Sequence, residues 1–407
     1  MAHGGSGIAD APDGRVVFVH GAIPGDRVEA TLTKVKSRWA RADVARILEP
    51  SSIRVEPACE AAAAGAGCCD LSHVSESAQL ELKRDVLLGQ LHALAGRSGV
   101  MGSSFAPERN VEAVALDPHT GWRTRVRLGV DAQGRAGFRR FRSNDLVTTV
   151  QCSQPVPGLL DGIVGPAARV FTPGSELVVV VDADGERHVV ETVSAQRGRR
   201  VERMTNVVEG SGEVTERIGA SVFRFPATAF WQAHVHAPQT YSNVISRWAG
   251  GTYDRGIGWD LYGGVGSFVP AMSAALGGGR VVSVDYSTSA TSRRQPALEG
   301  LEVDVVRSKV EDGINQLPAP GLVVLDPPRA GAGEDVITAI AQAGPERIIH
   351  VGCDPATFSR DIATFGAGGY QVIRMVLIDA FPSTHHFEVL ACLEPATAAG
   401  GGGGQTV

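Results

Sequence analysis

The C-terminal half of the chain alternates apolar, strand-like runs with helical stretches, and this pattern restricts the possible folds more than any other feature. From about residue 215 the apolar runs include "GIGWDLYG", "RVVSVDYS", "GLVVLDPP", "RIIHVGC" and "FEVLACLE". Strands that are apolar along their whole length are buried on both faces, as in a mostly parallel sheet covered by helices. We therefore predict an α/β domain over residues 213–395, with a ligand crevice at the carboxyl edge of its sheet.

The N-terminal part of the chain predicts two smaller units. Residues 1–55 contain short β-branched runs separated by turns such as Pro24-Gly25, which favours a small β-barrel of the OB type. Residues 56–110 begin with an Ala/Gly-rich stretch that holds three cysteines. An apolar stripe at helical spacing then predicts a helix over residues 75–96.

A central domain and a tail complete the predicted organisation. Residues 111–212 return to strands and contain two hairpin signals, "DAQGRA" and "DADGER", so we expect a β-rich, α+β central domain. Residues 396–407, "ATAAGGGGGQTV", cannot pack a core and predict a disordered tail.

The composition excludes several classes of protein. Of the 407 residues, 43% are hydrophobic and 20% are charged, as in an ordinary globular protein. No uncharged apolar run reaches the roughly 18 residues of a membrane helix, and the N-terminus lacks the basic start and apolar core of a signal peptide. With six cysteines and no such signal, we expect a reducing, cytoplasmic location and no membrane partner.

Two basic stretches contrast with the formal net charge of −6. Residues 34–54 carry six basic side chains against two acidic ones, and residues 122–142 carry seven arginines against Asp131 alone. Charge runs usually form solvated strand faces, but two of them in one chain also favour contact with RNA. The residues by themselves leave both interpretations open.

A glycine-rich turn follows one of the predicted strands. In "WDLYGGVGSF" (259–268), Gly263, Gly264 and Gly266 allow backbone amides to approach a ligand closely. The next strand ends in Asp285, about 20 residues later, where an acid can accept hydrogen bonds from ribose hydroxyls. The D-x-x-x-G-x-G spacing fits an S-adenosylmethionine turn better than a dinucleotide turn. A purely structural glycine turn is the alternative.

Three chemically useful side chains fall at successive strand ends. Asp326 ends the strand in "VLDPPRAG", Cys353 ends the next one in "HVGCDPATFSRD", and Glu388 begins the last one after "FPSTHH". A nucleophile and a carboxylate beside a cofactor crevice suit covalent catalysis with a later proton abstraction. Each residue also has an ordinary structural interpretation, as a turn-capping aspartate, a buried cysteine and a strand-edge acid.

The combination of these motifs resembles the RNA uracil-C5 methyltransferases, the 5-methyluridine-forming family. "FWQAH", "WDLYGGVGSF", "VVSVDYS", "VLDPPRAG", "HVGCDPATFSRD" and "FPSTHHFEVLACLE" occur in that family's order, and "DGRVVFVHGAIPGDRVEA" resembles the TRAM domain of its ribosomal-RNA branch. The stretch "AGFRRFRSNDLV" resembles the family's central RNA-contacting region. The resemblance implies a Rossmann-like class I methyltransferase domain with an N-terminal TRAM barrel and a central α+β domain.

The resemblance also implies a reaction, a cofactor and a partner. The Cys353 thiolate would attack C6 of a flipped-out uracil, C5 would take the methyl group of S-adenosylmethionine, and Glu388 would remove the C5 proton. The partner would be RNA, with 23S rRNA favoured by the TRAM domain and tRNA as the alternative, and the protein would act as a monomer. The cofactor would be lined by Gln232, Tyr262, Ser267, Asp285 and Asp326.

Four of the six cysteines match a metal site, but with altered spacing. The ribosomal-RNA branch binds a 4Fe–4S iron–sulfur cluster through a C-x-x-C pair, a preceding cysteine and a distant fourth. Here Ala66 stands where the pair would begin. The four candidate ligands are Cys59, Cys68, Cys69 and Cys152. An iron–sulfur cluster, zinc and no metal all remain open, and Cys392 is expected to be core.

Two rival functions make different demands on the residues. Methyltransferases that act on a nucleobase nitrogen or a glutamine often use an Asp/Asn-Pro-Pro-Tyr turn and need no thiol, but this chain has Arg329 and Cys353 instead. A non-catalytic RNA-binding or RNA-folding protein could keep the cofactor fold without chemistry. The presence of Cys353, Glu388, Asp326 and Gln232 argues against that alternative.

Overall fold

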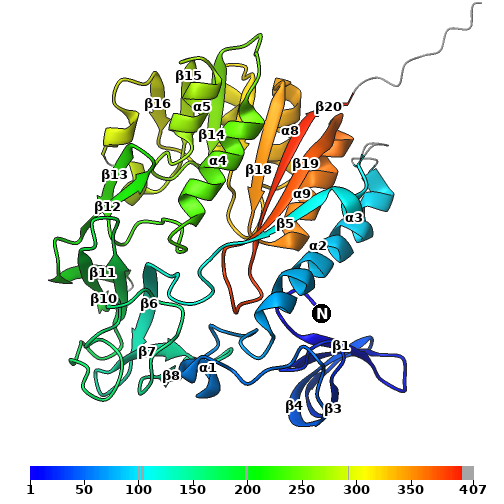
Figure 1. The fold of residues 1–407 in the computed structure, drawn as a ribbon. Helices are drawn as coiled ribbons and strands as arrows, with labels where there is room; N and C mark the ends of the chain where they lie inside the picture. Colours follow the sequence, from blue (N-terminus) through cyan, green and yellow to red (C-terminus); the bar gives the residue numbers. More distant parts are fainter. Residues whose placement is uncertain (99–100, 102–104, 198–199, 292, 397–407) are drawn as a thin grey trace, which may run out of the picture.

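The computed structural model describes residues 1–98, 101, 105–197, 200–291 and 293–396, and these residues form four β-sheets with helices around the largest (Figure 1). Except for Ala396, the predicted tail lies outside the described residues. Of the helices that are described, none has the length and apolar character needed to cross a membrane.

The largest sheet confirms the predicted α/β domain. Its five neighbouring strands β16, β15, β14, β17 and β18 run parallel, and β20 is antiparallel to both of its neighbours. The eight strands, in order across the sheet, are β16 (Val303–Val306), β15 (Arg280–Val284), β14 (Ile257–Leu261), β17 (Leu322–Leu325), β18 (Arg347–Gly352), β20 (Glu388–Pro395), β19 (Tyr370–Asp379) and β5 (Val111–Ala115).

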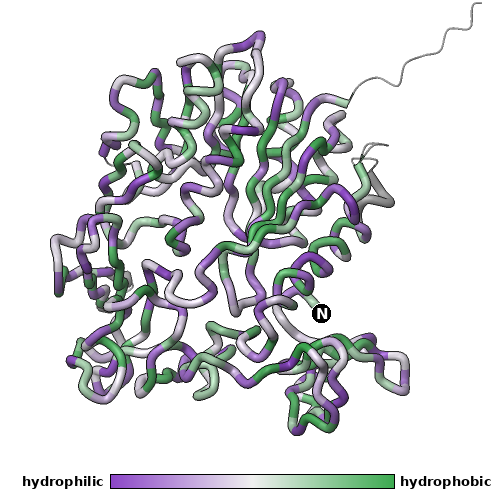
Figure 2. Tube along the Cα trace, viewed as in Figure 1, coloured by the Kyte–Doolittle hydropathy of each residue, from purple (hydrophilic) through white to green (hydrophobic). Residues whose placement is uncertain are grey.

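Helices bury both faces of this sheet. One face packs against α2 (Glu76–Ser98), α8 (Glu334–Ala343) and α9 (Pro355–Ala367), and the other against α4 (Ala237–Ala249) and α5 (Val269–Ala275). Successive residues of β17 alternate between the two cores, so a strand in the middle of the sheet must be apolar throughout. Figure 2 shows the resulting apolar strands in green through the sheet.

Strand β5 corrects one predicted boundary. The sequence placed residues 111–115 in the central domain, but β5 pairs in parallel with β19 and forms the edge of the large sheet. Helix α2, in the predicted cysteine-containing unit, packs on the same sheet through Val86, Leu87 and Leu91. The physical reason is burial, because Val111 of β5 and the face of α2 that carries Val86, Leu87 and Leu91 are apolar and pack in the core of the large domain.

The remaining sheets form the N-terminal and central units. The N-terminal sheet has the order β1 (Gly7–Asp10), β2 (Val16–His20), β4 (Trp39–Glu49) and β3 (Arg27–Val35). The central sheet has the order β11 (Arg200–Glu209), β10 (Arg187–Arg197), β9 (Glu176–Val181), β6 (Arg125–Val130), β7 (Ala136–Arg139) and β8 (Leu146–Val147). Both predicted hairpins are confirmed, as β6–β7 and β9–β10.

Short elements connect these units. The hairpin β12 (Glu213–Ile218) and β13 (Ser221–Pro226) packs on the central sheet and leads into the chain before α4. The remaining short helices are α1 (Glu60–Ala63), α3 (Pro107–Asn110), α6 (Thr288–Thr291), η1 (Pro296–Leu298), α7 (Val310–Gly313) and η2 (Ile314–Gln316).

Candidate active site

The strand register brings Cys353 and Glu388 together. Strand β18 ends at Gly352, which pairs with Val389 of the antiparallel strand β20. Continuing this register by one residue sets Cys353 opposite Glu388, the first residue of β20. Asp326 directly follows β17, the other neighbour of β18, so it lies at the same edge. The structure thus gathers the three strand-end residues that the sequence singled out.

The turn that carries the thiol is rigid. Asp354 caps helix α9, because its Oδ1 accepts hydrogen bonds from the backbone N–H groups of Ala356 and Thr357, both at 3.0 Å. Pro355 occupies the first position of the helix, where its missing N–H costs nothing. The nucleophile candidate therefore sits just before a helix N-terminus, a location that favours a thiolate.

Electrostatics at this edge oppose the simultaneous ionisation of all three acids. Burial, followed by the nearby carboxyls of Glu388 and Asp326, raises the pKa of the Cys353 thiol to about 12. Burial and then Asp326 raise the pKa of Glu388 well above its ordinary value. Desolvation and then Asp260 raise the pKa of Asp326 to about 7. A ligand or side chain that brings positive charge would favour the ionised forms.

Arg329 supplies positive charge beside these acids. It follows the two prolines after Asp326, and its charge opposes the upward pKa shifts of both Cys353 and Glu388. Its guanidinium Nη2 lies 3.4 Å from Nε2 of His386, two residues before Glu388. Arg329 was not among the residues predicted for the site, although its position in "DPPRAG" marks it as a neighbour of Asp326.

Two buried polar atoms without partners lie in this region. Among the described residues, neither the hydroxyl of Tyr241 on α4 nor Oε2 of Glu388 has a hydrogen-bond partner. The charges of Glu388, Asp326 and Cys353 all act on the Tyr241 hydroxyl, whose pKa is raised first by complete burial. Sequence reasoning missed Tyr241 because an aromatic residue on an apolar helix face is indistinguishable from core.

The glycine turn is built for close backbone approach. A Cβ at Gly263 would lie 2.1 Å from Oδ2 of Asp260, so a larger residue does not fit. Gly264 has φ +57° and donates its N–H to Oδ2 of Asp285 at 3.0 Å. This links the turn after β14 to the acid after β15, as a cofactor cradle in this fold class requires. Asp260 was not among the residues predicted for the site, although it begins the D-x-x-x-G-x-G pattern.

The other predicted cofactor residues surround this turn or approach it from a separate segment. Tyr262 adopts φ +60°, and its hydroxyl donates to Oε1 of Glu311 at 3.3 Å. Ser267 is half-buried in the same turn. Gln232 is half-buried between β13 and α4, two residues after Phe230, whose side chain is 74% exposed. Their roles in cofactor binding stay predictions.

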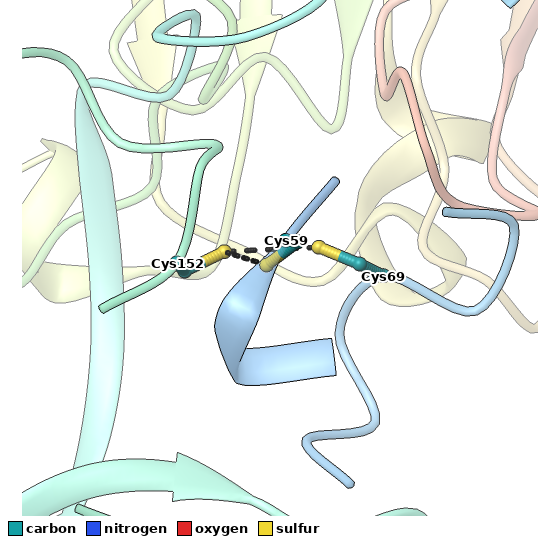
Figure 3. Close-up of side chains that lie close together, drawn as sticks. All are labelled: Cys59, Cys69 and Cys152. Atoms are coloured by element: carbon teal, nitrogen blue, oxygen red, sulfur yellow. Dashed lines mark hydrogen bonds between the residues drawn. The ribbon is translucent and has the colours of Figure 1, made fainter. Parts of the chain in front are cut away.

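Three of the four predicted metal-binding cysteines converge. The Sγ atoms of Cys59, Cys69 and Cys152 lie within 4.8 Å of one another, and Figure 3 shows them pointing toward a common centre. Sγ of Cys152 lies 3.7 Å from Sγ of both other residues. We call these three residues the cysteine trio. Cys68 lies beside it, and hydrogen bonding with Cys152 and then Cys69 lowers the Cys68 pKa to about 4.

The spacing of the cysteine trio favours a single metal ion. Thiolates bound tetrahedrally to one ion at about 2.3 Å lie about 3.8 Å apart, close to the 3.7 Å observed between Cys152 and its neighbours. A 4Fe–4S cluster binds each thiolate through a different iron and needs wider separations. The trio therefore fits one soft ion as it stands, whereas the predicted iron–sulfur cluster requires the thiols to move apart.

The basic stretches divide into buried and exposed parts. Arg125 is largely buried and pairs with Glu216 at 3.3 Å, so it stabilises the central domain instead of forming surface. Four exposed arginines of residues 122–142 line a cavity of about 590 Å³ together with Phe141 and Cys68. They are Arg127, Arg139, Arg140 and Arg142. On the N-terminal sheet, Lys34 and Arg41 lie over the ring of Trp39. Arginine with aromatic side chains is typical of RNA-binding surfaces.

Comparisons with known proteins agree with this geometry. The model of the tRNA (uracil-5-)-methyltransferase family matches residues 318–395, and that of the TRAM domain matches residues 2–45. An uncharacterized RNA methyltransferase of Corynebacterium efficiens is 50% identical over 395 residues, covering 96% of this chain and 91% of that protein. A 23S rRNA (uracil(1939)-C(5))-methyltransferase of Halomonas elongata is 29% identical over 450 residues, covering 97% of this chain and 88% of that protein.

A solved structure shares the fold. The tRNA (uracil-54, C5)-methyltransferase of Pyrococcus abyssi, in complex with S-adenosyl-L-homocysteine, superposes with a TM-score of 0.66 at 21% identity. The match covers 95% of this chain and 99% of that one. The predicted fold class, with its N-terminal TRAM domain, is thereby confirmed.

Proposed function

Because the chain belongs to the family of RNA uracil-C5 methyltransferases, we propose that it methylates C5 of a uridine in 23S rRNA through a covalent adduct with Cys353. The observation that carries the proposal is the strand register that sets the Cys353 thiol opposite the Glu388 carboxyl. The TRAM domain and the Halomonas relative support rRNA as the substrate. The Pyrococcus neighbour makes tRNA the alternative.

The first step needs the Cys353 thiolate. The thiol releases its proton to solvent, and the N-terminus of α9 and the charge of Arg329 stabilise the resulting anion. Sulfur bonds to C6 of the uracil, and the electron pair of the C5–C6 double bond moves onto the C4 carbonyl as an enolate. The neutral base is a poor carbon nucleophile at C5, so this addition provides the required electron density.

The second step returns the base to aromaticity and frees the enzyme. S-adenosylmethionine, when bound, would supply an electrophilic methyl group: the enolate electron pair would form the bond from C5 to the methyl carbon as the methyl–sulfur bond breaks, and S-adenosylhomocysteine would leave. The Glu388 carboxylate then removes the C5 proton, the electron pair re-forms the double bond to C6, and the Cys353 thiolate leaves. Glu388 finally returns its proton to solvent. The burial of Glu388 and its unpaired Oε2 suit this role, because a desolvated carboxylate is a stronger base.

The cofactor is held by the turn after β14 and the strand ends beside it. Asp285 accepts from Gly264 on one oxygen, and each carboxylate oxygen can accept a further hydrogen bond from a ribose hydroxyl. Tyr262 and Ser267 lie in the same turn, Gln232 approaches from the segment before α4, and Asp326 lies by the reacting groups. These residues orient the cofactor and hold the target base against Cys353.

The cysteine trio binds a single thiolate-coordinated ion in our proposal, and Cys68, which is hydrogen-bonded to Cys152 and Cys69, is the candidate for a fourth thiol. Metal analysis of protein purified without oxygen tests this. About one zinc or other divalent ion per chain, without acid-labile sulfide, supports the proposal. Iron and sulfide in equal amounts would instead support the family's 4Fe–4S cluster.

The catalytic proposal is tested with RNA that contains 5-fluorouridine. Fluorine at C5 cannot leave as a proton, so the adduct should persist and be visible by mass spectrometry on the peptide that contains Cys353. Incubation with S-adenosylmethionine and a 5-fluorouridine transcript of 23S rRNA should trap the protein, whereas Cys353→Ala should not react. Normal methylation by Cys353→Ala would refute the mechanism, and trapping by a tRNA transcript alone would change the substrate.

A further inference from the structure

The loop that leads to Glu388 is held from outside the sheet. Strand β19 ends at Asp379 and β20 begins at Glu388. Residues 380–387 between them reach toward α2 and toward residues 59–71, which we call the cysteine segment (Figure 1). We call residues 380–387 the base loop. Three groups of hydrogen bonds hold it from α2 and from the residues after Cys69, and Arg329, on the turn after β17, lies 3.4 Å from His386.

Helix α2 supplies the first two groups of contacts. Lys83 donates to Oδ1 of Asp379 at 2.6 Å and to the carbonyl of Phe381 at 3.1 Å. Gln79 accepts from the N–H of Ser383 at 2.7 Å. Ser383 has φ +66°, a left-handed conformation that is strained for a non-glycine residue. Such a conformation persists only where its surroundings impose it.

The cysteine segment supplies the third group. The N–H of Leu71 donates to the carbonyl of Ser383 at 3.0 Å. Oδ1 of Asp70 accepts from the N–H of His385 at 2.9 Å, and its Oδ2 lies against Nδ1 of the His385 ring. The Asp70 side chain is only 7% exposed. Asp70 and Leu71 are the two residues after Cys69, a member of the cysteine trio.

We propose that Asp70 is a positioning residue for Glu388, the catalytic base. Asp70 fixes the base loop, and thereby the Glu388 carboxylate, relative to the C5 atom of the uracil. The path from Asp70 to the base is short, since His385 is three residues before Glu388 and its ring lies 3.9 Å from that of His386, centre to centre. This inference rests on the proposed function. It adds that Cys69 of the cysteine trio, one residue from Asp70, is connected through the base loop to Glu388, the residue that removes the C5 proton.

The geometry predicts which step depends on Asp70. Cys353 is held by β18 and the cap of α9, neither of which contacts Asp70 through a hydrogen bond among the described residues. Loss of Asp70 should therefore leave addition of the thiolate and methyl transfer intact. Proton removal should slow, because displacing a catalytic group by about 1 Å can cost about 100-fold in rate.

Two RNA substrates separate these steps. On a 5-fluorouridine transcript of 23S rRNA, the reaction stops after methyl transfer and reports only the steps before proton removal. On the matching uridine transcript, turnover requires all steps. We expect Asp70→Ala to form the 5-fluorouridine adduct within about twofold of the unchanged protein, but to turn over uridine RNA about 100-fold more slowly. Deuterium at C5 should then slow Asp70→Ala more than the unchanged protein.

Controls make each outcome decisive. Glu60→Ala removes an exposed acid that also neighbours a cysteine of the trio, Cys59, and should behave like the unchanged protein. Asp70→Asn keeps an acceptor for the N–H of His385 and should lie between the two, which keeps the test available if Asp70→Ala does not fold. Equal slowing of adduct formation and turnover, or no slowing of either, would overturn the inference. Failure of the unchanged protein to form any adduct would overturn the proposed function instead.

Discussion

The buried ion pair between Lys83 and Asp379 gives a prediction whose magnitude follows from the structure. The two side chains are 0% and 2% exposed and lie 2.6 Å apart, connecting α2 to the end of β19. In Lys83→Met, the N–H of Phe381, 3.1 Å away, is the donor that the Asp379 carboxylate keeps among the residues described by the structure. Removing one partner of a buried pair costs about 3–5 kcal/mol, because the other charge stays buried without compensation.

We therefore expect Lys83→Met to lower the opening free energy of this region by about 4 kcal/mol. The chain contains several structural units, so global unfolding is not assumed to be two-state, and hydrogen exchange measured by mass spectrometry is the better assay. Because about 1.4 kcal/mol corresponds to a factor of ten, protection in peptides from α2 and the end of β19 should fall about 1000-fold.

The double variant Lys83→Met/Asp379→Asn isolates the buried charge. Asparagine can still accept from Phe381 but carries no charge, so the double variant should recover at least about 2 kcal/mol of the loss. Asp85→Ala, at an exposed position of the same helix, is the matched control and should change protection little. A loss below about 1 kcal/mol in Lys83→Met, or a double variant no better than the single one, would refute the reasoning.

Three further perturbations test other parts of the molecule. Glu388→Gln should slow methylation by about 100-fold or more while a covalent complex with uridine RNA accumulates. It should also shift iodoacetamide alkylation of Cys353 to lower pH, because a neighbouring carboxyl that raises the thiol pKa is gone; an unchanged alkylation profile would contradict the electrostatic argument. Burial opposes ionisation of Asp26, but hydrogen bonds from Arg54, Ser51 and Ile23 outweigh it and lower its pKa to about 2. Since this folded pKa lies below the unfolded value of about 3.9, the stabilisation is present at neutral pH and is lost as pH falls toward 2. Melting temperatures of Asp26→Asn should thus be lower than those of the unchanged protein at pH 6, with a smaller difference at pH 3 that largely disappears near pH 2, whereas a constant difference would count against the pKa shift. Gly263→Ala should abolish cofactor binding in calorimetry, since its Cβ would lie 2.1 Å from Oδ2 of Asp260; Gly89→Ala on α2, with open space around it, should bind normally.

The strand ends were predictable because two local rules suffice. A fully apolar run identifies a buried strand, and parallel strands carry their carboxyl ends to one edge of a sheet. Asp326, Cys353 and Asp285 follow such runs directly, so their common edge could be inferred without knowledge of packing. Glu388 reaches the same edge because β20 runs in the opposite direction and begins there.

Partners that are distant in the sequence left no local signal. Val111 pairs with Met375, and nothing in the alternation of "VEAVA" identifies that strand as its neighbour. Lys83 and Asp379 are separated by 296 residues, and on a helix Lys83 looks like any solvated lysine. The burial of Arg125 left no local signal for a related reason, because a run of charges does not reveal that Arg125 faces Glu216 inside the central domain.

Cys68 and Cys69 are adjacent, whereas the two cysteines of a C-x-x-C pair are separated by two residues. Neighbouring side chains in a non-helical segment point in different directions, so two adjacent thiols do not enter one small site equally. Cys69 belongs to the cysteine trio, whereas Cys68 also lines the arginine cavity. Asp70, the next residue, holds the base loop. Three consecutive residues therefore lie at the arginine cavity, the cysteine trio and the base loop, and Cys68 is also hydrogen-bonded to the trio. An insertion or deletion in this segment would misplace the cavity, the trio and the catalytic base at the same time.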